Sequence, residues 1–480
     1  MTIYATSVPY SLSASVSGTL PLSFQWQKNS VSNLLTATNI PGATSGSLTF
    51  NPPTTNDTGW YDLIVTNFGG KATSAPVLLT VLAPLTSSFV TQAWTLPANS
   101  RPYLDSSTYN TRGLAYDTNT ATVLVADHNA TAISVLNAAD GSDNLSITIN
   151  TLGLPPGTFT LNQIAVADDG VLYGGNTVLP GDGFPFSLTR WSAVSSGASE
   201  SAAYSGDPGG GSGDRWGDTI SIRGSGANTQ ILLGSYGQGY GPGTNVALLT
   251  TTDGLTFSAL SIPVGNVPAG FAGLGIAFGA GNTFWAKGGH GFNLRQVAFD
   301  PTGATPASVL QVYTAGTDVP NDLTGLGVDA ANNILGGVCF NDAPNDLQLY
   351  LLTGTTNAPV LFDQAFFGSI NANSQENAVT VMKFPRAFSL DVNNGLVALT
   401  YGVPPPPVTP FSVTANNVHG TGVVLSWPAV VGRSYQLQST PSISPTAWSN
   451  VGSPITATAT PMSYTNSTPT GTLYYRVIGH

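Results

Sequence analysis

A short pattern recurs six times between residues 85 and 403, and it constrains the fold more than any other feature of the chain. Each copy has a leading residue followed by small, apolar, small and apolar residues, and a turn then leads into a second strand-like segment. The copies are Arg112–Tyr116, Asn162–Val166, Asp218–Ile222, Ala272–Ile276, Thr324–Val328 and Arg386–Leu390. Alternation with a period of two predicts strands, and the regular spacing predicts one small sheet for each copy.

Small residues that alternate with apolar ones suit the innermost strand of a propeller blade, where backbones approach closely around the axis. Six copies therefore predict a six-bladed β-propeller over residues 85–403. The last copy ends too early to provide four strands, so residues from elsewhere must close the ring. Phe89–Leu96 precede the first copy and belong to no repeat, so we expect them to complete the sixth blade.

Composition agrees with an all-β chain and excludes several classes of protein. The 480 residues include 55 Gly and 34 Pro, which interrupt helices, while 41% apolar residues suffice for large cores. A net charge of −11 with only 13 Lys and Arg argues against nucleic-acid binding. No apolar run approaches the roughly 18 residues of a transmembrane helix. The single cysteine, Cys339, cannot form an internal disulfide.

Residues 1–83 have the strand spacing of a β-sandwich. Trp26 occupies the position of a central buried Trp, and Asp57-Thr-Gly-Trp-Tyr61-Asp-Leu63 follows the tyrosine-corner pattern. The segment resembles an immunoglobulin-like domain. It differs from that family at both cysteine positions, where Ala14 and Leu63 stand, so we expect apolar packing to replace the disulfide.

Residues 408–480 read as a second small sandwich. Val423–Pro428, Ser434–Gln438 and Leu473–Val477 resemble the B, C and G strands of a fibronectin type III-like module. Residues 404–407, four consecutive prolines, should form a semi-rigid polyproline II linker before it. The sequence thus predicts an all-β protein in which two sandwiches flank a six-bladed propeller.

The propeller segment resembles bacterial propellers of the NHL-repeat and gluconolactonase-like kind. It also resembles an uncharacterised family of secreted bacterial propellers that carry an Asp-Arg-Trp-Gly-Asp stretch, here Asp214–Asp218, flanked by similar sandwiches. In gluconolactonase-like propellers the rim of the funnel holds a divalent cation. Arg112 and Arg386 stand at two of the six rim positions here, and they would repel a cation.

Groups suited to catalysis are scarce in this chain. It has four histidines, of which only His128 and His290 fall within the propeller, and both are expected as exposed turn residues. Glycoside hydrolysis needs a pair of carboxylates, and the propeller segment has only two glutamates, Glu200 and Glu376. We therefore assign no catalytic residue.

No metal site and no cofactor are assigned either. Zinc lacks a suitable Cys or His spacing. Calcium prefers oxygen ligands such as carboxylates, which the chain offers in several clusters, but no specific calcium-binding motif is present. The acidic clusters are Asp168-Asp169, Asp207 with Asp214 and Asp218, and Asn341-Asp342 with Asp346.

The candidate binding site is the funnel rim formed by the first residue of each repeat. If the copies superpose, these residues face one funnel, with Arg386 next to Arg112 across the ring closure. Arginine offers a planar fork to a carboxylate, a sulfate or sugar hydroxyls, although both arginines could instead tie blades together through Asp218 or Asp117. Aromatic residues that follow Gly-rich loops could stack on a sugar. The candidate ligand-binding residues are Arg112, Asn162, Asp218, Thr324, Arg386, Trp216, Tyr236 and Tyr240, with Ala272 breaking the ring.

Three functions fit these observations. The first is a secreted or cell-surface, non-catalytic recognition or adhesion protein whose propeller binds a glycan, a matrix component or another extracellular ligand. The second is a secreted hydrolase or lyase that acts on polysaccharide or lactone in the funnel. The third is a structural subunit that self-assembles through the edges of its terminal sandwiches.

An extracellular location is expected from composition. A charge-poor, neutral-polar surface on an all-β chain is typical of bacterial secreted proteins. Met1–Tyr10 contain neither a basic segment nor an apolar run, so the sequence shows no signal peptide.

Overall fold

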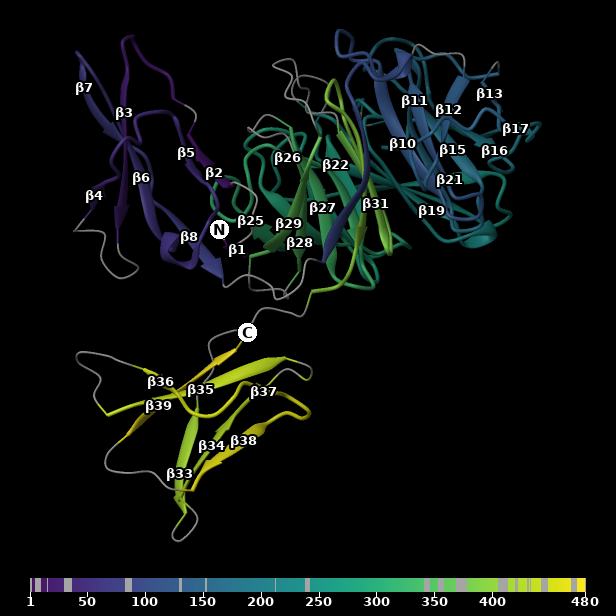
Figure 1. The fold of residues 1–480 in the computed structure, drawn as a ribbon. Helices are drawn as coiled ribbons and strands as arrows, with labels where there is room; N and C mark the ends of the chain where they lie inside the picture. The colour runs from purple at the N-terminus through teal and green to yellow at the C-terminus, as the bar shows by residue number, and fades with distance from the viewer. Residues whose placement is uncertain are drawn as a thin grey trace. The chain divides into compact units, whose positions relative to one another are not determined.

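The computed structural model spans residues 1–480 (Figure 1). It describes all of them except residues 1, 5–9, 15, 30–36, 83–88, 129–131, 152, 212, 238–241, 341–345, 353–357, 368–377, 405–412, 419–421, 430, 432, 442–447, 468–472 and 480. The chain divides into two compact units, one made of Met1–Leu82 with Phe89–Val403 and the other containing Pro404–His480. In the described residues, no helix is long and apolar enough to cross a membrane.

The N-terminal sandwich contains strands β1 to β8 and a short helix. Their bounds are β1 Thr2–Tyr4, β2 Tyr10–Ser13, β3 Ser23–Asn29, β4 Thr38–Asn39, β5 Ser47–Phe50, η2 Thr55–Asp57, β6 Gly59–Asn67, β7 Gly70–Thr73 and β8 Val77–Leu82. One sheet has the order β1-β8-β6-β3-β4 with β7 also on β6, and β2 pairs with β5 in the other. β1 further pairs in parallel with β29 of the propeller, so the two parts of this unit share a sheet.

The core of this sandwich confirms the immunoglobulin-like pattern. Trp26 is buried opposite Leu63, and its indole Nε1 donates to the Ser45 carbonyl at 2.9 Å. Tyr61 is buried too, and its hydroxyl donates to the Asp57 carbonyl at 2.5 Å, as a tyrosine corner requires. Ala14 packs against the same cluster. Apolar packing therefore occupies the place of the missing disulfide.

The propeller consists of four-stranded sheets, each with its first strand innermost. From the inside outwards, blade 1 has β10 Thr111–Asp117, β11 Thr122–Asp127, β12 Ala132–Asn137 and β13 Ile149–Asn150, and blade 2 has β14 Phe159–Val166, β15 Leu172–Thr177, β16 Phe186–Trp191 and β17 Glu200–Gly206. Blade 3 has β18 Ile220–Arg223, β19 Gln230–Gly234, β20 Asn245–Thr251 and β21 Phe257–Pro263, and blade 4 has β22 Gly275–Phe278, β23 Thr283–Lys287, β24 Leu294–Ala298 and β25 Ser308–Tyr313. Blade 5 has β26 Leu323–Asp329, β27 Ile334–Cys339, β28 Asp346–Leu351 and β29 Val360–Phe366, and blade 6 has β30 Ala378–Lys383, β31 Arg386–Asp391, β32 Gly395–Tyr401 and β9 Val90–Pro97. Short helices η3 Pro102–Leu104 and η4 Gly226–Asn228 lie in loops.

Each innermost strand contacts the next, and β30 contacts both β26 and β10, so the ring closes. The apolar cores lie between neighbouring blades, and Cys339 is buried in one of them. The all-β prediction of a propeller with two sandwiches is confirmed.

Blade 6 closes as expected at its outer edge but not at its inner one. β9 pairs with β32 from Val90–Tyr401 to Pro97–Gly395, so the segment before the first repeat does supply the outermost strand. The sixth repeat was assigned to the wrong strand, however. Arg386 begins β31, the second strand, and the innermost strand is β30, because Lys383 pairs with Arg386 across a hairpin.

The C-terminal unit is a small sandwich of two sheets, yellow-green in Figure 1. β34 lies between β33 and β38, while β35 pairs with β36, β37 and β39. Leu425, Trp427, Tyr435 and Leu437 fill the space between the sheets. The strands are β33 Thr414–Val418, β34 Gly422–Trp427, β35 Ser434–Thr440, β36 Ser449–Asn450, β37 Ile455–Thr456, β38 Met462–Asn466 and β39 Tyr474–Gly479.

Candidate functional site

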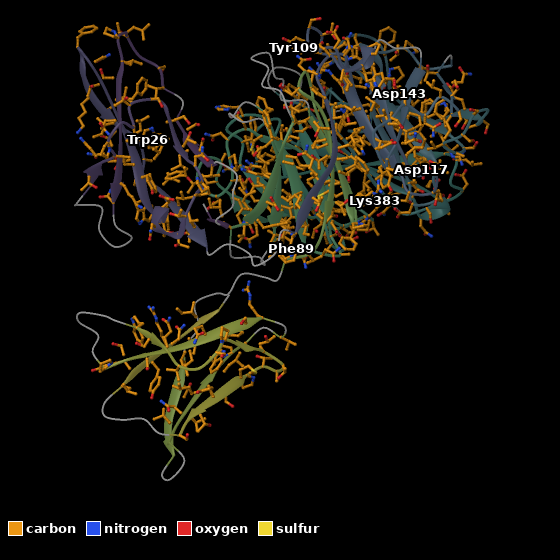
Figure 2. The ribbon with its side chains drawn as sticks, viewed as in Figure 1. Trp26, Phe89, Tyr109, Asp117, Asp143 and Lys383 are labelled. Carbon is orange, nitrogen blue, oxygen red and sulfur yellow. The ribbon has the colours of Figure 1, made fainter. Side chains whose placement is uncertain are left out.

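The propeller has two ends, which we name by the direction of its innermost strands. The strand-start face holds the beginnings of β10, β14, β18, β22, β26 and β30, and the strand-end face holds their last residues. Contacts at each end confirm that the strands run side by side: Gln163 Nε2 donates to the Arg112 carbonyl at the start, and Phe278 N to Ser221 Oγ near the end. Figure 2 shows Tyr109 at one end of the blades, away from Asp117 and Lys383.

Two of the predicted rim residues, Asn162 and Thr324, tie blades together. Asn162 Nδ2 donates to the Gly217 carbonyl at 2.8 Å, and Thr324 Oγ1 to the Leu274 carbonyl at 2.7 Å. Both side chains are at most 1% exposed, and Ala272 is fully buried. Asn162 Nδ2 and Thr324 Oγ1 therefore serve contacts between blades rather than a ligand, while Asn162 Oδ1 is buried and has no hydrogen-bond partner in the described structure.

Arg386 does not join Arg112. It lies at the strand-end face, where its Nη1 donates to the Ala138 carbonyl of blade 1 at 2.6 Å. The two arginines are therefore on opposite faces, and the predicted arginine pair is wrong. Arg386 instead closes the ring by a hydrogen bond to the backbone, rather than through Asp218 or Asp117.

The predicted aromatic platform is only partly present. Trp216 is 1% exposed, and its Nε1 donates to Asp207 Oδ1 at 3.2 Å, so it cannot stack on a sugar. Tyr236 is half-buried at the strand-start face. Tyr240 lies outside the described residues.

Arg215, Asp218 and Tyr236 form the first polar cluster of this face. The guanidinium of Arg215 binds the Asp218 carboxylate through two hydrogen bonds, 2.7 and 2.6 Å long, and stacks 4.6 Å from the centre of the Tyr236 ring. Gly217, between them in sequence, has φ +97°, and a Cβ there would collide with the Asn176 carbonyl. The glycine therefore lets the Asp-Arg-Trp-Gly-Asp stretch turn against blade 2 and present Arg215.

Arg112, His128 and Phe159 form the second polar cluster. His128 stacks on Phe159 with ring centroids 4.0 Å apart, and the Arg112 guanidinium lies 5.7 Å from the same ring. Both polar side chains are buried, His128 with 7% and Arg112 with 8% exposure. The prediction that His128 is an exposed turn residue is wrong, because Phe159 of the next blade covers it.

His290 and Asp322 form a third polar group on the same face. His290 Nδ1 lies 2.5 Å from Asp322 Oδ1, with the imidazole 47% exposed and the carboxylate 6% exposed. Lys287 Nζ donates to the carbonyls of Gly289 and Asn321, which flank the pair in sequence. A carboxylate that orients an exposed imidazole is an arrangement suited to proton transfer. Sequence reasoning missed it because the two residues are 32 positions apart.

The strand-end face has a different character. A cavity of about 470 Å³ opens there between the ends of the innermost strands, with mainly apolar walls such as Ile222, Phe278 and Val381. Lys383 and Asp168 form an ion pair of 2.6 Å and both line this cavity. Asp117 accepts hydrogen bonds within its own hairpin turn, so this carboxylate serves local structure.

In the predicted acidic cluster of Asp207, Asp214 and Asp218, each carboxylate accepts hydrogen bonds from its own set of donors. Asp207 accepts from the amides of Gly209 and Gly211, and Asp214 from Gly243 N and Asn245 Nδ2. Asp218 is bound to Arg215. Among the described residues, no three His, Cys, Asp or Glu side chains gather as a metal site.

The remaining residues considered for catalysis or metal binding lie away from the funnel or outside the described residues. Glu200 lies on β17, the outermost strand of blade 2, far from the funnel. Glu376, Asn341 and Asp342 lie outside the described residues, as do His419 and His480.

Burial of His128 makes a prediction about pH. Burial first, and then the charge of Arg112, lower the pKa of His128 from 6.5 to about 4. The unfolded chain therefore takes up this proton before the folded protein does, and the stabilisation is complete above pH 6.5 and lost as pH falls towards 4. We expect the free energy of unfolding to fall by roughly 2–3 kcal/mol across this window on account of His128.

Urea unfolding of the wild type and His128→Asn at several pH values measures this contribution. An identical pH dependence in wild type and His128→Asn would contradict the assignment.

Comparisons with known proteins find only distant structural similarity, so the fold is assigned from the pairing of the strands. No protein-family model and no curated protein matches the chain. A solved structure of a luciferin-regenerating enzyme aligns at 12% identity over 62% of this chain and 92% of its own, with a TM-score of 0.40. Hydrazine synthase of Kuenenia stuttgartiensis aligns at 8% identity over 73% and 94%, with a TM-score of 0.37. Immunoglobulin domains 1–4 of Sidekick-1 align at 10% identity over 89% and 91%, with a TM-score of 0.13.

TM-scores this low carry no argument about activity. The strand pairing defines an all-β protein with a β-propeller, an immunoglobulin-like sandwich and a second sandwich.

Proposed function

We propose that this chain is a secreted or cell-surface recognition protein whose propeller binds a glycan or another extracellular ligand on its strand-start face. The observation that carries the proposal is the burial of positive charge there. The whole chain has 13 Lys and Arg, yet four of them lie buried or nearly so in the strand-start half of the propeller: Arg112, Arg215, Lys287 and Arg295.

Burying a cation costs free energy unless partners compensate it, so such groups are found more often at functional sites than elsewhere. The turns of the strand-end face hold mainly carboxylates that are satisfied by their own hairpins. The Tyr236 ring beside Arg215 adds an aromatic face of the kind that stacks on sugars. Together these features favour a polar, hydroxyl-bearing ligand at the strand-start face.

Binding of the full chain to an array of neutral and acidic oligosaccharides tests this proposal. We expect Tyr236→Ala to weaken binding of the best oligosaccharide about tenfold, because the variant removes the stacking face. Phe384→Ala is the matched control, since Phe384 is an exposed aromatic residue at the strand-end face. No binding, or a loss with Phe384→Ala alone, would contradict the proposal.

A second candidate, a secreted hydrolase or lyase acting on polysaccharide or lactone, is favoured by the His290–Asp322 pair. An imidazole oriented by a buried carboxylate can act as a general base. His290→Asn should then abolish turnover while leaving oligosaccharide binding unchanged. Turnover that persists in this variant would exclude His290 as the base.

The finer resemblances belong to the same proposal. The strands that resemble a fibronectin type III-like module correspond to β34, β35 and β39, which lie in the two sheets of the C-terminal sandwich. The repeat pattern supports a propeller of the NHL-repeat or gluconolactonase-like kind, of bacterial origin.

A further inference from the structure

Arg112 is a buried cation without a matching anion. Only its Nε has a hydrogen-bond partner among the residues that the structure describes, the Tyr109 carbonyl at 2.6 Å. The nearest carboxylate that acts on its charge is Asp218, and both oxygens of Asp218 already bind Arg215. Within the described part of the chain, the two Nη groups of Arg112 are therefore left for a partner from outside the protein.

His128 has an unused polar atom beside Arg112. Its Nδ1 is buried and has no hydrogen-bond partner in the described structure. The backbone of His128 is fixed through a hydrogen bond to the Asn110 carbonyl, and its ring is fixed by stacking on Phe159. A buried nitrogen without a hydrogen-bond partner costs free energy. A ligand that binds both His128 Nδ1 and the guanidinium of Arg112 would remove this cost.

The charge of the combined site points to the kind of ligand. Asp218 is the carboxylate that acts on the charge of Arg112, and Arg215 already binds both of its oxygens, so Arg112 has no ion-pair partner of its own in the described structure. His128 stays neutral beside them, because burial and the charge of Arg112 lower its pKa. A divalent cation would be repelled here, and a neutral sugar would leave the charge of Arg112 unbalanced. A carboxylate or a sulfate ester would balance it and accept hydrogen bonds from the guanidinium fork.

A purely structural role explains less of this geometry. The blade contact at Arg112 runs through its backbone carbonyl, which Gln163 binds, and holding the Tyr109 carbonyl needs one N–H. Arg223 at the strand-end face shows the alternative. It stacks on Phe278, but its guanidinium nitrogens bind Gln230, Gly281 and Asn282, so that arginine is fully engaged in structure.

We propose that Arg112 and His128 form a subsite for one anionic group, a carboxylate or sulfate ester carried by a sugar ligand. The inference rests on the proposed function and specifies its ligand as an acidic saccharide. Arg112 Nη groups and His128 Nδ1–H donate to the anion, and Phe159 fixes the imidazole plane.

Histidine-selective ¹³C labelling of the full chain tests the subsite, because the chain has only four histidines. Substitution of each histidine assigns the signals. The probes are inorganic sulfate, methyl glucuronide, and methyl glucoside as the neutral match to the glucuronide. We expect sulfate and methyl glucuronide to shift the His128 signal and methyl glucoside to leave it unchanged. A His128 signal that responds to neither anion, or equally to the neutral glucoside, overturns the subsite.

Variants of the two arginines provide the second arm. Arg112→Gln should weaken the affinity for methyl glucuronide roughly 10- to 100-fold, as expected for the loss of hydrogen bonds to a charged group. Arg223→Gln, which removes the arginine that structure already engages, should leave it unchanged. Equal affinity in wild type and Arg112→Gln overturns the subsite, and the wild-type titration decides the matter if Arg112→Gln does not fold.

The two proposals fail in different ways. If neutral oligosaccharides bind and Tyr236→Ala weakens them while His128 ignores both anions, recognition on the strand-start face stands and the anionic subsite is wrong. If no saccharide or anion binds, both are wrong.

Discussion

Replacement of β9, Val90–Pro97, by a flexible Gly–Ser segment of equal length is expected to lower the free energy of unfolding by roughly 5–10 kcal/mol. β9 is the strand that closes the ring, and it pairs with β32 along its whole length. Trp94 on β9 is buried, and its Nε1 donates to the Ala138 carbonyl of blade 1 at 2.9 Å. Leu96 is buried in the same core. The replacement would remove both side chains and leave β32 as an open edge.

Equilibrium unfolding in urea measures the loss, with light scattering to detect association through the exposed edge. The control is the same replacement of β17, Glu200–Gly206, an outermost strand that buries only Ala203 and does not close the ring. A β9 replacement that unfolds at the wild-type urea concentration, or no lower than the β17 control, would show that β9 does not close the propeller.

Trp26→Ala is expected to cost roughly 3–5 kcal/mol of stability, because it empties the centre of the immunoglobulin-like sandwich. Trp26 is 3% exposed, and no disulfide holds the two sheets together there. Calorimetry of the full chain measures the change. Trp60→Ala is the matched control, since Trp60 is only half-buried, and it should cost less. Equal, small costs for both variants would contradict the packing account.

The sequence was sufficient to predict the propeller because its signal is local. Alternating small and apolar residues identify innermost strands, and five of the six repeats overlap such a strand. The tyrosine corner is equally local, since Tyr61 and its partner Asp57 are four residues apart. The closing strand could be predicted because Phe89–Leu96 belonged to no repeat and the last repeat was too short to provide four strands.

The sixth repeat shows the limit of such patterns. Arg386–Leu390 has the same alternation as an innermost strand, but β31 is the second strand of its blade and is buried almost throughout. The true innermost strand, Ala378–Lys383, carries the same alternation, because the small residues Ala378 and Thr380 alternate with valines. A period of two does not distinguish neighbouring strands of one hairpin, so Arg386 was expected at the opposite end of the propeller from where it lies.

The site was harder to predict because burial depends on contacts between blades. Asn162 and Thr324 look available in sequence, but carbonyls of neighbouring blades bind them. His128 looks exposed, but Phe159, 31 residues later, covers it. Arg112 was identified from its repeat position alone. Arg215 lay within a stretch that sequence analysis singled out, and its spacing of three from Asp218 was the available signal for their ion pair.

A crystal structure of the full chain with an acidic oligosaccharide that contains glucuronate would locate both the sugar and its carboxylate. We expect a sugar at the strand-start face, with its carboxylate bound to the Nη groups of Arg112 and to His128 Nδ1, near Tyr236. A saccharide seated instead in the cavity of the strand-end face, or one at the strand-start face whose carboxylate points into solvent away from Arg112, would contradict this expectation.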